Sequence, residues 1–473
     1  MPPERKEGDL MALFCASEGA ALCGGRLYGP DIKISRGWKC DSREINPGDG
    51  FVALKGAATD GHLYLHQAIE RGAKLLLAEA AELERLNIRG EAYSGVSFIA
   101  VADTQRALAS LAEEYLRRVS PRVAAITGSV GKTTTRELTA AALKNRFRVH
   151  SAIRSFNTLV GCSLTILAMA EDTEVLVLEL GTNHFGEIEE MVSHFPPEIA
   201  VITEVAPCHL EGFGSLEGVL RAKLEICGSP RLAAVVFNND NGLLKNYMSY
   251  NFDNIKKIAV GSGEGASLKI KEAEVRLDEN GPRTSAVLYR EGKDISLSCS
   301  LFGMQHAYNM GYAFAVASWL GLSDEEAAAG IAEISPISGR GLCKRSASRG
   351  WVIDEAYNAN PASMSAAIRN TRAAAESLGV RKWAILAGMR ELGESAAEWH
   401  RRIIGELADF DGVMLLGEEW RGCGPLPEGA ALFSSLEELI SKIDYNDLND
   451  KMILVKGSNS YGLKRVVGAL TEA

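Results

Sequence analysis

Residues 127–134, with the sequence TGSVGKTT, combine the residue types that bind the phosphates of a nucleotide. Gly128 and Gly131 permit a tight turn whose backbone amides converge on an anion. Lys132 adds a positive charge, and the hydroxyl of Thr133 suits a metal ion. The stretch therefore predicts a triphosphate cradle. Its expected members are Gly128, Ser129, Gly131, Lys132, Thr133 and Thr134.

A strand and a helix must hold such a turn, and the flanking sequence predicts both. Residues 123–127 form a short apolar run with β-branched ends, which is typical of a buried strand. Residues 136–143 have helical apolar spacing, so the positive end of a helix would face the same anion. Ile126 stands where the longer phosphate-loop pattern has its first glycine. A glycine-rich turn with a surface lysine is the alternative interpretation.

Two polar residues come after further apolar runs. Glu179 lies near the C-terminal end of the run in EVLVLEL, and His209 follows the run in IAVITEV after a short loop. Ligand groups in open α/β sheets lie at the carboxyl ends of the strands. We therefore expect Glu179 to serve Mg²⁺, directly or through water. For His209 a purely structural place in the loop is the alternative.

The composition argues against several classes of protein. The chain has 473 residues, 46% hydrophobic and 24% charged, which is typical of a globular protein with roughly three domains. A net charge of −10 without any Lys/Arg run argues against general nucleic-acid binding. The N-terminal MPPERKEGDLMALF has no long apolar segment, and the nine cysteines occur singly. We therefore expect a cytoplasmic protein with reduced thiols and no membrane span.

The order of the expected elements divides the chain into three units and predicts an α/β fold. Residues 1–120 contain a βαβ pattern and end in a helix at 103–118 with an aspartate cap. Residues 121–335 hold the cradle, with a small excursion of short alternating strands at 268–300. Residues 336–473 form a second, smaller α/β layer.

Further motifs follow one another in a specific order along nearly the whole chain. They are DSR (41–43), FVALKG (51–56), TGSVGKTTT (127–135), LELGTNHFGEI (178–188), HLEGFGSLEGVLRAKLEI (209–226), SGR (338–340), DEAYNANPASM (354–364) and VKGS (455–458). Each motif alone is weak evidence, but the set is specific in order and spacing. Together they resemble the Mur ligase family.

The resemblance implies three domains and a reaction. The domains are an N-terminal UDP-substrate-binding domain at 1–120, a central P-loop ATPase domain with a parallel sheet at 121–335, and a C-terminal Rossmann-like ligase domain at 336–473. The implied reaction is the ATP-dependent joining of D-alanyl-D-alanine to UDP-N-acetylmuramoyl-tripeptide through an acyl phosphate, in peptidoglycan precursor synthesis. ATP and Mg²⁺ are the implied cofactors. We expect a monomer without nucleic-acid or membrane partners.

The resemblance also implies roles for single residues. Lys132 and the cradle amides would hold the ATP phosphates, while Thr133, Glu179 and His209 would serve magnesium ions. Lys223 matches a lysine that becomes carbamylated, which turns an ammonium into a carboxylate-like anion able to bind a second Mg²⁺. An unmodified lysine there would repel the metal.

Other matches concern the nucleotides and the acceptor substrate. On the ATP side they are Asn309 near the adenine, Arg340 at the phosphates, and Asp354, Tyr357 and Asn358 in a C-terminal nucleotide loop. On the acceptor side they are Ser42 and Arg43 for the uridine diphosphate, and Asn157 and Thr158 for the muramoyl group. In isolation the stretch at 41–43 is more typical of a solvated turn, an interpretation that the resemblance replaces.

The chain departs from the family pattern at several positions. Residues 387–389 read Ala-Gly-Met instead of Gly-Asp-Met, so the acid is missing at Gly388, and Asn459 replaces an arginine. Gln-His at 305–306 replaces His-Asn, and Ser163 replaces a proline. Gly388 and Asn459 lie in the domain expected to receive the amine. They leave the ATPase prediction intact and leave the identity of the amine donor open. No DNPR stretch, typical of the ligase that adds diaminopimelate or lysine, is present, which favours D-alanyl-D-alanine.

Two further hypotheses stay open beside the tripeptide ligase. One is a Mur-like amide ligase that acts on a different acid or amine. The other is a non-catalytic binding protein on the same scaffold. The second is disfavoured because the chemistry-bearing positions are all retained; these are Lys132, Thr133, Glu179, His209 and Lys223.

Overall fold

The computed structural model describes residues 14–34, 37–56, 59–88, 93–152, 155–346, 350–445 and 447–472. These residues form two compact units. One comprises Met1–Val123, Arg148–Leu180 and Glu189–Pro197, and the other comprises Ala124–Phe147, Gly181–Ile188 and Glu198–Ala473. Residues 1–13, which supplied most of the prediction about the N-terminus, lie outside the described ranges.

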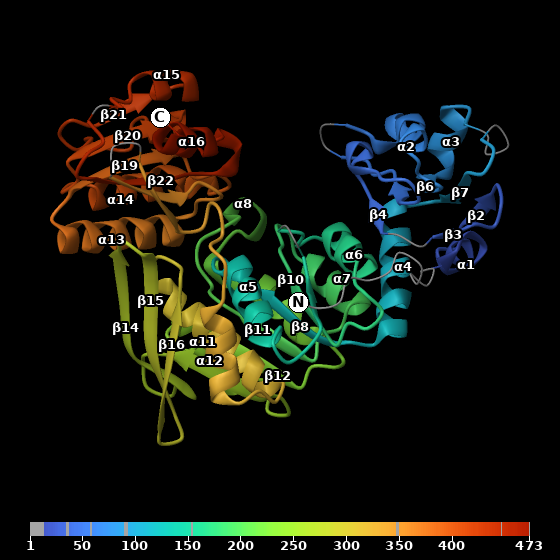
Figure 1. Cartoon of the computed structure of the whole chain (residues 1–473), viewed down its shortest axis with the longest axis horizontal. Helices are drawn as coiled ribbons and strands as arrows, with labels where there is room; N and C mark the ends of the chain where they lie inside the picture. The colour runs from blue at the N-terminus through green and yellow to red at the C-terminus, as the bar shows by residue number, and fades with distance from the viewer. Residues whose placement is uncertain are drawn as a thin grey trace. The chain divides into compact units, whose positions relative to one another are not determined.

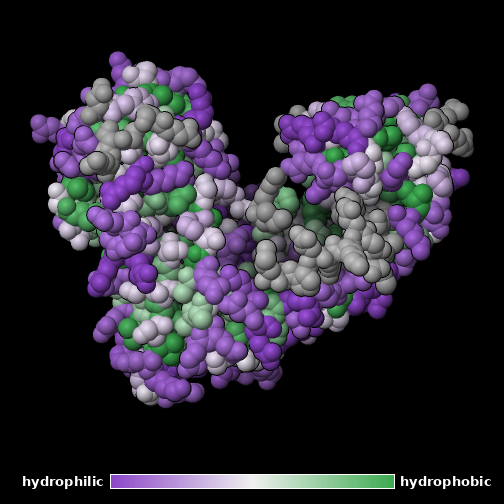
Figure 2. Space-filling view, viewed as in Figure 1, coloured by the Kyte–Doolittle hydropathy of each residue, from purple (hydrophilic) through white to green (hydrophobic). Residues whose placement is uncertain are grey.

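No helix in these ranges is long and apolar enough to cross a membrane. Each of the nine cysteines is a free thiol, as their single spacing predicts. Hydrophilic residues predominate on the face shown in Figure 2, and hydrophobic ones appear there as small separate areas.

The first unit contains a sheet whose strand order is β2-β7-β6-β5-β4. The strands are β2 (Arg26–Tyr28), β4 (Trp38–Lys39), β5 (Gly50–Val52), β6 (Leu75–Glu79) and β7 (Ser97–Val101). β5 and β6 are parallel and are joined through α2 (Leu65–Glu70), which confirms the predicted βαβ pattern. α4 (Thr104–Val119) begins after Asp103, whose carboxylate accepts the amides of Gln105 and Arg106 as the predicted cap.

The rest of the first unit carries candidate residues at element ends. β9 (Val149–Ser151) and β10 (Val175–Glu179) are parallel, and Glu179 is the last residue of β10, as predicted. α6 (Leu159–Leu167) packs on α4. The shorter helices α1 (Ala16–Leu22) and α3 (Ala80–Arg85) complete this unit, and β1 (Phe14–Cys15) pairs with β3 (Lys33–Ile34).

In the second unit a sheet follows the order β16-β15-β14-β13-β12-β11-β8 (Figure 1). Its parallel strands are β8 (Arg122–Thr127), β11 (Ile199–Ile202), β12 (Ala234–Asn238) and β13 (Lys256–Gly261). Three longer strands continue it, namely β14 (Leu268–Asp278), β15 (Gly281–Arg290) and β16 (Lys293–Cys299). The predicted β excursion at 268–300 is therefore present, but its strands are longer than predicted and continue the sheet of this domain. β14 joins the sheet through two residue pairs with β13, which the local alternation of side chains does not reveal.

Helices cover this sheet. α5 (Lys132–Leu143) packs on both α11 (Gln305–Trp319) and α12 (Asp324–Ala332). α11 is buried over most of its surface because its apolar residues lie all round it, which is typical of an interior helix. α8 (Leu210–Phe213), α9 (Leu216–Leu224) and α10 (Gly242–Tyr250) follow the strands in between, while most of α7 (Glu187–His194) belongs to the first unit.

The C-terminal sheet has the order β17-β18-β22-β19-β20-β21. β18 (Trp351–Glu355), β19 (Arg381–Ala387), β20 (Gly412–Leu416) and β22 (Lys451–Lys456) are the four predicted apolar strands, and they are parallel. The edge strands β17 (Leu342–Arg345) and β21 (Ala431–Phe433) were not predicted. The helices are α13 (Pro361–Leu378), α14 (Ala396–Glu406), α15 (Leu436–Ser441) and α16 (Lys464–Glu472).

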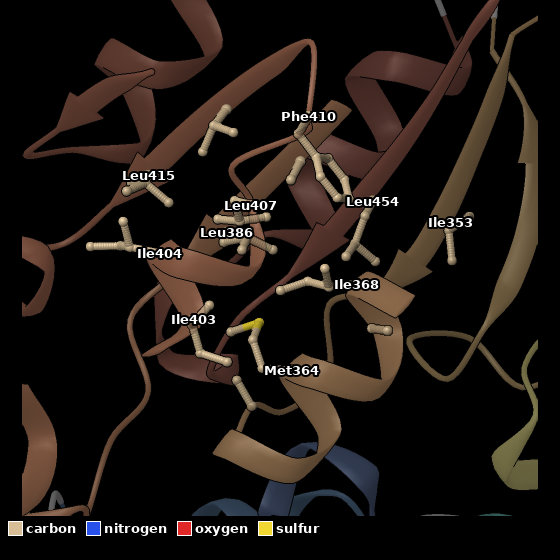
Figure 3. Close-up of a cluster of buried hydrophobic side chains, with 14 of the residues drawn as sticks. Ile353, Met364, Ile368, Leu386, Ile403, Ile404, Leu407, Phe410, Leu415 and Leu454 are labelled. Carbon is tan, nitrogen blue, oxygen red and sulfur yellow. The ribbon is translucent and has the colours of Figure 1, made fainter. Parts of the chain in front are cut away.

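Apolar clusters lie on both faces of the C-terminal sheet. Figure 3 shows the one formed with α13 and α14, where Met364 and Ile403 meet strand residues such as Leu386. Leu277 of β14 and Phe302 after β16 belong to this same cluster. The central and C-terminal sheets therefore share buried apolar side chains.

Candidate nucleotide and substrate site

The predicted cradle is a strand, a turn and a helix, as the sequence indicates. Gly128 and Gly131 have φ angles of +143° and +84°, which residues with a β-carbon rarely adopt. A β-carbon at Gly128 would lie 2.1 Å from Oγ1 of Thr203, and one at Gly131 would lie 2.9 Å from Oδ1 of Asn309. Lys132 donates from Nζ to the Gly128 carbonyl at 2.7 Å, so its charge lies over the turn. This geometry fits an anion cradle.

The loop after β11 supports the turn. The Ser129 hydroxyl donates to the Ala206 carbonyl at 2.8 Å and accepts the Ala206 amide at 3.0 Å. Cys208 lies 3.2 Å from the same hydroxyl, and the Thr203 hydroxyl donates to the Val130 carbonyl at 2.5 Å. Ser129 thus fixes the shape of the cradle with its side chain and also with its backbone amide, which donates to the Glu204 carbonyl at 2.8 Å.

Asn309 lies against the cradle from α11. Its Oδ1 accepts the Thr135 hydroxyl at 3.3 Å, and its Nδ2 lies 3.2 Å from Nδ1 of His306. Thr133 and Thr134 are buried in the first turn of α5. Sequence reasoning placed Asn309 on the adenine side, and this stays a prediction.

His209 contacts the C-terminal domain directly. Its Nδ1 forms a hydrogen bond with the carboxylate of Glu391, in the loop after β19. Burial lowers the pKa of His209, and the Glu391 carboxylate opposes that shift. Both residues have positive φ angles, +48° and +63°. With Nδ1 engaged, Nε2 is the nitrogen left to bind a metal.

Lys223 is buried in α9. Its side-chain nitrogen lies 5.7 Å from the centre of the Phe213 ring. Burial, and secondly the positive charge of Lys132, lower the pKa of Lys223 to about 7. A large share of this lysine is therefore uncharged at neutral pH.

The C-terminal candidates gather at the end of β18. The buried Asp354 accepts the amides of Gly339 at 3.0 Å and Ala356 at 3.1 Å. The Arg340 guanidinium lies 4.4 Å from the centre of the Tyr357 ring. Asn358 accepts Nζ of the buried Lys456 on its carbonyl at 2.9 Å. The structure thus brings Arg340, Asp354, Tyr357 and Asn358 together, and Asp354 orders the loops around it.

The first unit brings three of its candidate residues together. The Asn157 amide donates to Oε1 of the buried Glu179 at 3.0 Å. Thr158 caps α6, and its hydroxyl accepts the Gly161 amide at 3.2 Å. The predicted acceptor residue Asn157 therefore lies beside the predicted magnesium residue Glu179.

Ser42 and Arg43 differ in environment. Ser42 is buried and donates to Oε1 of Gln67 at 2.6 Å. Arg43 is exposed and bonds the Asp41 carboxylate at 2.9 and 2.7 Å. An exposed guanidinium paired only with its neighbour can turn to a phosphate at little cost.

The donor set suits a hard cation. In the second unit the donors are a threonine hydroxyl, an imidazole and a lysine that can become a carbamate, that is Thr133, His209 and Lys223; in the first unit the donor is the carboxylate of Glu179. Across the described ranges no three His, Cys, Asp or Glu side chains cluster as a ready metal site. A hard cation would take further oxygens from phosphate, water or a carbamate.

Sequence reasoning missed two residues at this site. Glu391 lies in the ELG stretch beside the altered 387–389 turn, and that stretch was the sequence feature that could have identified it. Lys456 lies in the VKGS motif and bonds Glu355 at 3.1 Å. The apolar runs and charges of the local sequence did not predict the contact of either residue.

Known protein families and curated relatives match this chain along most of its length. Residues 126–317 match the Mur ligase middle domain, residues 339–459 the Mur ligase glutamate ligase domain, and residues 36–116 the Mur ligase family catalytic domain. The UDP-N-acetylmuramoyl-tripeptide–D-alanyl-D-alanine ligase of Escherichia coli is 30% identical over 457 residues, covering 95% of this chain and 97% of that one. The chain belongs to the Mur ligase family. This Mur ligase is therefore an ATP-dependent ligase.

Other relatives agree along the full length. The ligase of the same name from Treponema pallidum is 31% identical to this Mur ligase over 96% of both chains. A crystal structure of MurF from Acinetobacter baumannii is 25% identical, with a TM-score of 0.85, over 98% of this chain and 100% of that one. MurF from Thermotoga maritima in complex with ADP is 26% identical, with a TM-score of 0.76, over 92% and 97% of the chains. The predicted three-domain Mur ligase fold is confirmed.

Proposed function

We propose that this Mur ligase joins D-alanyl-D-alanine to UDP-N-acetylmuramoyl-tripeptide in cytoplasmic peptidoglycan precursor synthesis. The observation that carries the proposal is the full-length similarity to curated ligases of that name, about 30% identical over 95–96% of this chain. The nucleotide cradle and the retained Lys132 and Lys223 support an active enzyme.

In this mechanism the terminal phosphoryl group of ATP passes to the carboxylate of the tripeptide, and the dipeptide amine then attacks the resulting acyl phosphate. Lys132 and the amides of the turn hold the phosphates, so catalysis is mainly positioning and electrostatic stabilisation. Arg340 and the loop around Asp354 bring the C-terminal domain to the nucleotide. Closure of that domain would keep water from the acyl phosphate.

Mg²⁺, when bound, offsets the charge of the phosphates. Thr133, Glu179 and His209 are the residues we assign to it. We also infer that Lys223 is carbamylated, because only an uncharged amine reacts with CO₂ and its pKa of about 7 leaves much of it uncharged. The carbamate would give this buried position a negative charge for a second ion.

Phosphate release tests the proposed reaction. Purified protein receives ATP, Mg²⁺ and UDP-N-acetylmuramoyl-tripeptide, with and without D-alanyl-D-alanine. We expect release that depends on the dipeptide, and a pentapeptide product by mass spectrometry. Nucleotide binding without turnover on any substrate would instead support a binding protein.

A Mur-like ligase with another acid or amine substrate is the second candidate. Gly388 and Asn459, which lack the acid and the arginine of the family pattern, favour it. Phosphate release with a different amine, and none with D-alanyl-D-alanine, would support this candidate and exclude the first.

A further inference from the structure

Three loops meet at the carboxyl ends of β19, β20 and β22, and each supplies one residue to a charged cluster. The carboxylate of Glu419 accepts the hydroxyl of Tyr461 on Oε2 and lies 3.2 Å from Nε of Arg390 on Oε1. The Arg390 guanidinium lies 4.9 Å from the centre of the Tyr461 ring. We call these three residues the Glu419 cluster.

Two glycines make room for this cluster. A β-carbon at Gly388 would lie 2.7 Å from Oε2 of Glu419 and 3.1 Å from the Tyr461 hydroxyl. A β-carbon at Gly417 would lie 2.5 Å from each of the same two oxygens. The Glu419 carboxylate thus fills the space into which a side chain at position 388 would extend. An acidic side chain at position 388 and the Glu419 side chain in its present position could not both occupy this space.

The surrounding contacts hold the cluster in position. The Ser458 hydroxyl donates to the Gly388 carbonyl at 3.0 Å, and the Met389 amide donates to Nε2 of the buried His400 at 3.0 Å. Solvent still reaches the charged groups, since the Glu419 side chain is 23% exposed and that of Arg390 is 53% exposed. Ligands of open α/β sheets bind at such strand ends.

The charges of the cluster match a zwitterion. A carboxylate and a guanidinium side by side offer opposite partners to the ammonium and carboxylate of an amino acid or a short peptide. Neither group belongs to the phosphate cradle, which lies in the other sheet of this unit. An amide ligase needs a place for an amine substrate.

We propose that Glu419 binds the ammonium group of the incoming amine substrate and that Arg390 binds its carboxylate. In this chain Glu419, after the neighbouring strand β20, supplies the carboxylate that is absent at position 388. The inference rests on the proposed function, since it names the amine subsite of that reaction.

Steady-state kinetics of Glu419→Gln test this assignment, with Glu418→Gln as the matched control. Glu418 lies on the same short turn, and its carboxylate pairs with Arg421 outside the cluster. We expect Glu419→Gln to raise the KM for D-alanyl-D-alanine about tenfold to a hundredfold, the worth of one hydrogen bond to a charged group. The KM values for ATP and the UDP-linked peptide, and the melting temperature, should stay near wild type.

A rescue variant distinguishes a role of Glu419 in dipeptide binding from a role in stabilising the fold. Glu419→Ala should lose dipeptide affinity, and the double variant Glu419→Ala/Gly388→Asp should regain part of it, because a carboxylate returns to the same space. An unchanged dipeptide KM in Glu419→Gln would overturn the assignment. A parallel rise of the KM values for the dipeptide, ATP and the UDP-linked peptide, together with a lower melting temperature, would also overturn it.

A failure of the proposed function would give a different result from a failure of the subsite assignment. If wild-type protein makes no product with D-alanyl-D-alanine but releases phosphate with another amine, the reaction assignment fails. The comparison of Glu419→Gln with Glu418→Gln is then made with that amine and decides the role of Glu419. If no amine supports release, the subsite assignment falls as well.

Discussion

The side-chain nitrogen of Lys223 lies 5.7 Å from the centre of the Phe213 ring, and the lysine is almost wholly buried. No carboxylate forms an ion pair with this nitrogen within the part of the chain that the structure describes. Burial therefore dominates and, with the charge of Lys132, lowers the pKa to about 7. A buried amine near its pKa at neutral pH is suited to reversible reaction with CO₂.

Replacing Lys223 with alanine should lower turnover at least about a hundredfold, since even the outer partners of metal ligands cost roughly 10–100-fold when removed. Wild-type enzyme freed of CO₂ should regain activity when bicarbonate is added, and Lys223→Ala should not. A carbamate signal in ¹³C NMR with labelled bicarbonate provides the direct measurement. Full activity of Lys223→Ala, or a wild type indifferent to bicarbonate, would contradict carbamylation. Lys144→Ala, at an exposed position, is the control.

Glu391→Gln should weaken the affinity of the enzyme for magnesium through its effect on His209. The carboxylate pairs with Nδ1 of His209 and so orients Nε2 toward a metal. We expect the Mg²⁺ concentration for half-maximal phosphate release to rise about tenfold, within the range seen for such partners. Glu394→Gln, an exposed position in the same loop, should leave it unchanged. Identical magnesium curves for both variants would argue against a metal role for His209.

His306 should make stability depend on pH. Burial lowers its pKa to about 4, whereas an unfolded histidine has a pKa near 6.5. Between these values the unfolded chain binds a proton that the folded chain does not, so the free energy of unfolding falls as pH falls from 6.5 to 4. The loss over the whole window is on the order of 3 kcal/mol.

Urea unfolding at pH 8 and pH 4.5 measures this effect in wild type and His306→Gln. The stability of the variant should fall less between the two pH values, since glutamine does not titrate. Other histidines contribute equally to both proteins and cancel in the difference. Equal losses in the two proteins would show that His306 does not titrate as expected.

Gly128→Ala should weaken ATP binding because the backbone and the neighbouring side chain both oppose a β-carbon. The φ angle is +143°, and the added carbon would lie 2.1 Å from Oγ1 of Thr203. Strain of this kind costs about 1–3 kcal/mol, which corresponds to about fivefold to 150-fold weaker binding in a titration with a fluorescent nucleotide. Gly228→Ala, where a β-carbon meets nothing within 4 Å, is the control. Wild-type affinity in Gly128→Ala would contradict the cradle assignment.

Features with a local cause were predictable from the sequence. The strand, turn and helix around Lys132, the Asp103 cap of α4 and the place of Glu179 at the end of β10 all follow from neighbouring residues. The edge strands β17 and β21 were missed because four and three residues are too few to show a period.

Long-range contacts were not predictable. The hydrogen bond of His209 with Glu391 spans 182 residues, and no local pattern encodes it. The Glu419 cluster likewise depends on the strand order β22-β19-β20, which places three distant loops at one edge. Sequence comparison indicated the missing acid at Gly388, whereas only the structure indicates which residue fills its space.

The shared apolar cluster of Leu277 and Phe302 with the C-terminal sheet limits how this enzyme can be cut into fragments. A fragment that begins at residue 336 lacks both side chains, so the apolar cluster on that face of the C-terminal sheet would be incomplete. We expect such a fragment to bind a hydrophobic dye and to aggregate, although its own sheet is intact. A boundary before residue 268 keeps the β14–β16 strands with this cluster but takes α11 and α12 away from α5, so the central and C-terminal parts are better expressed together.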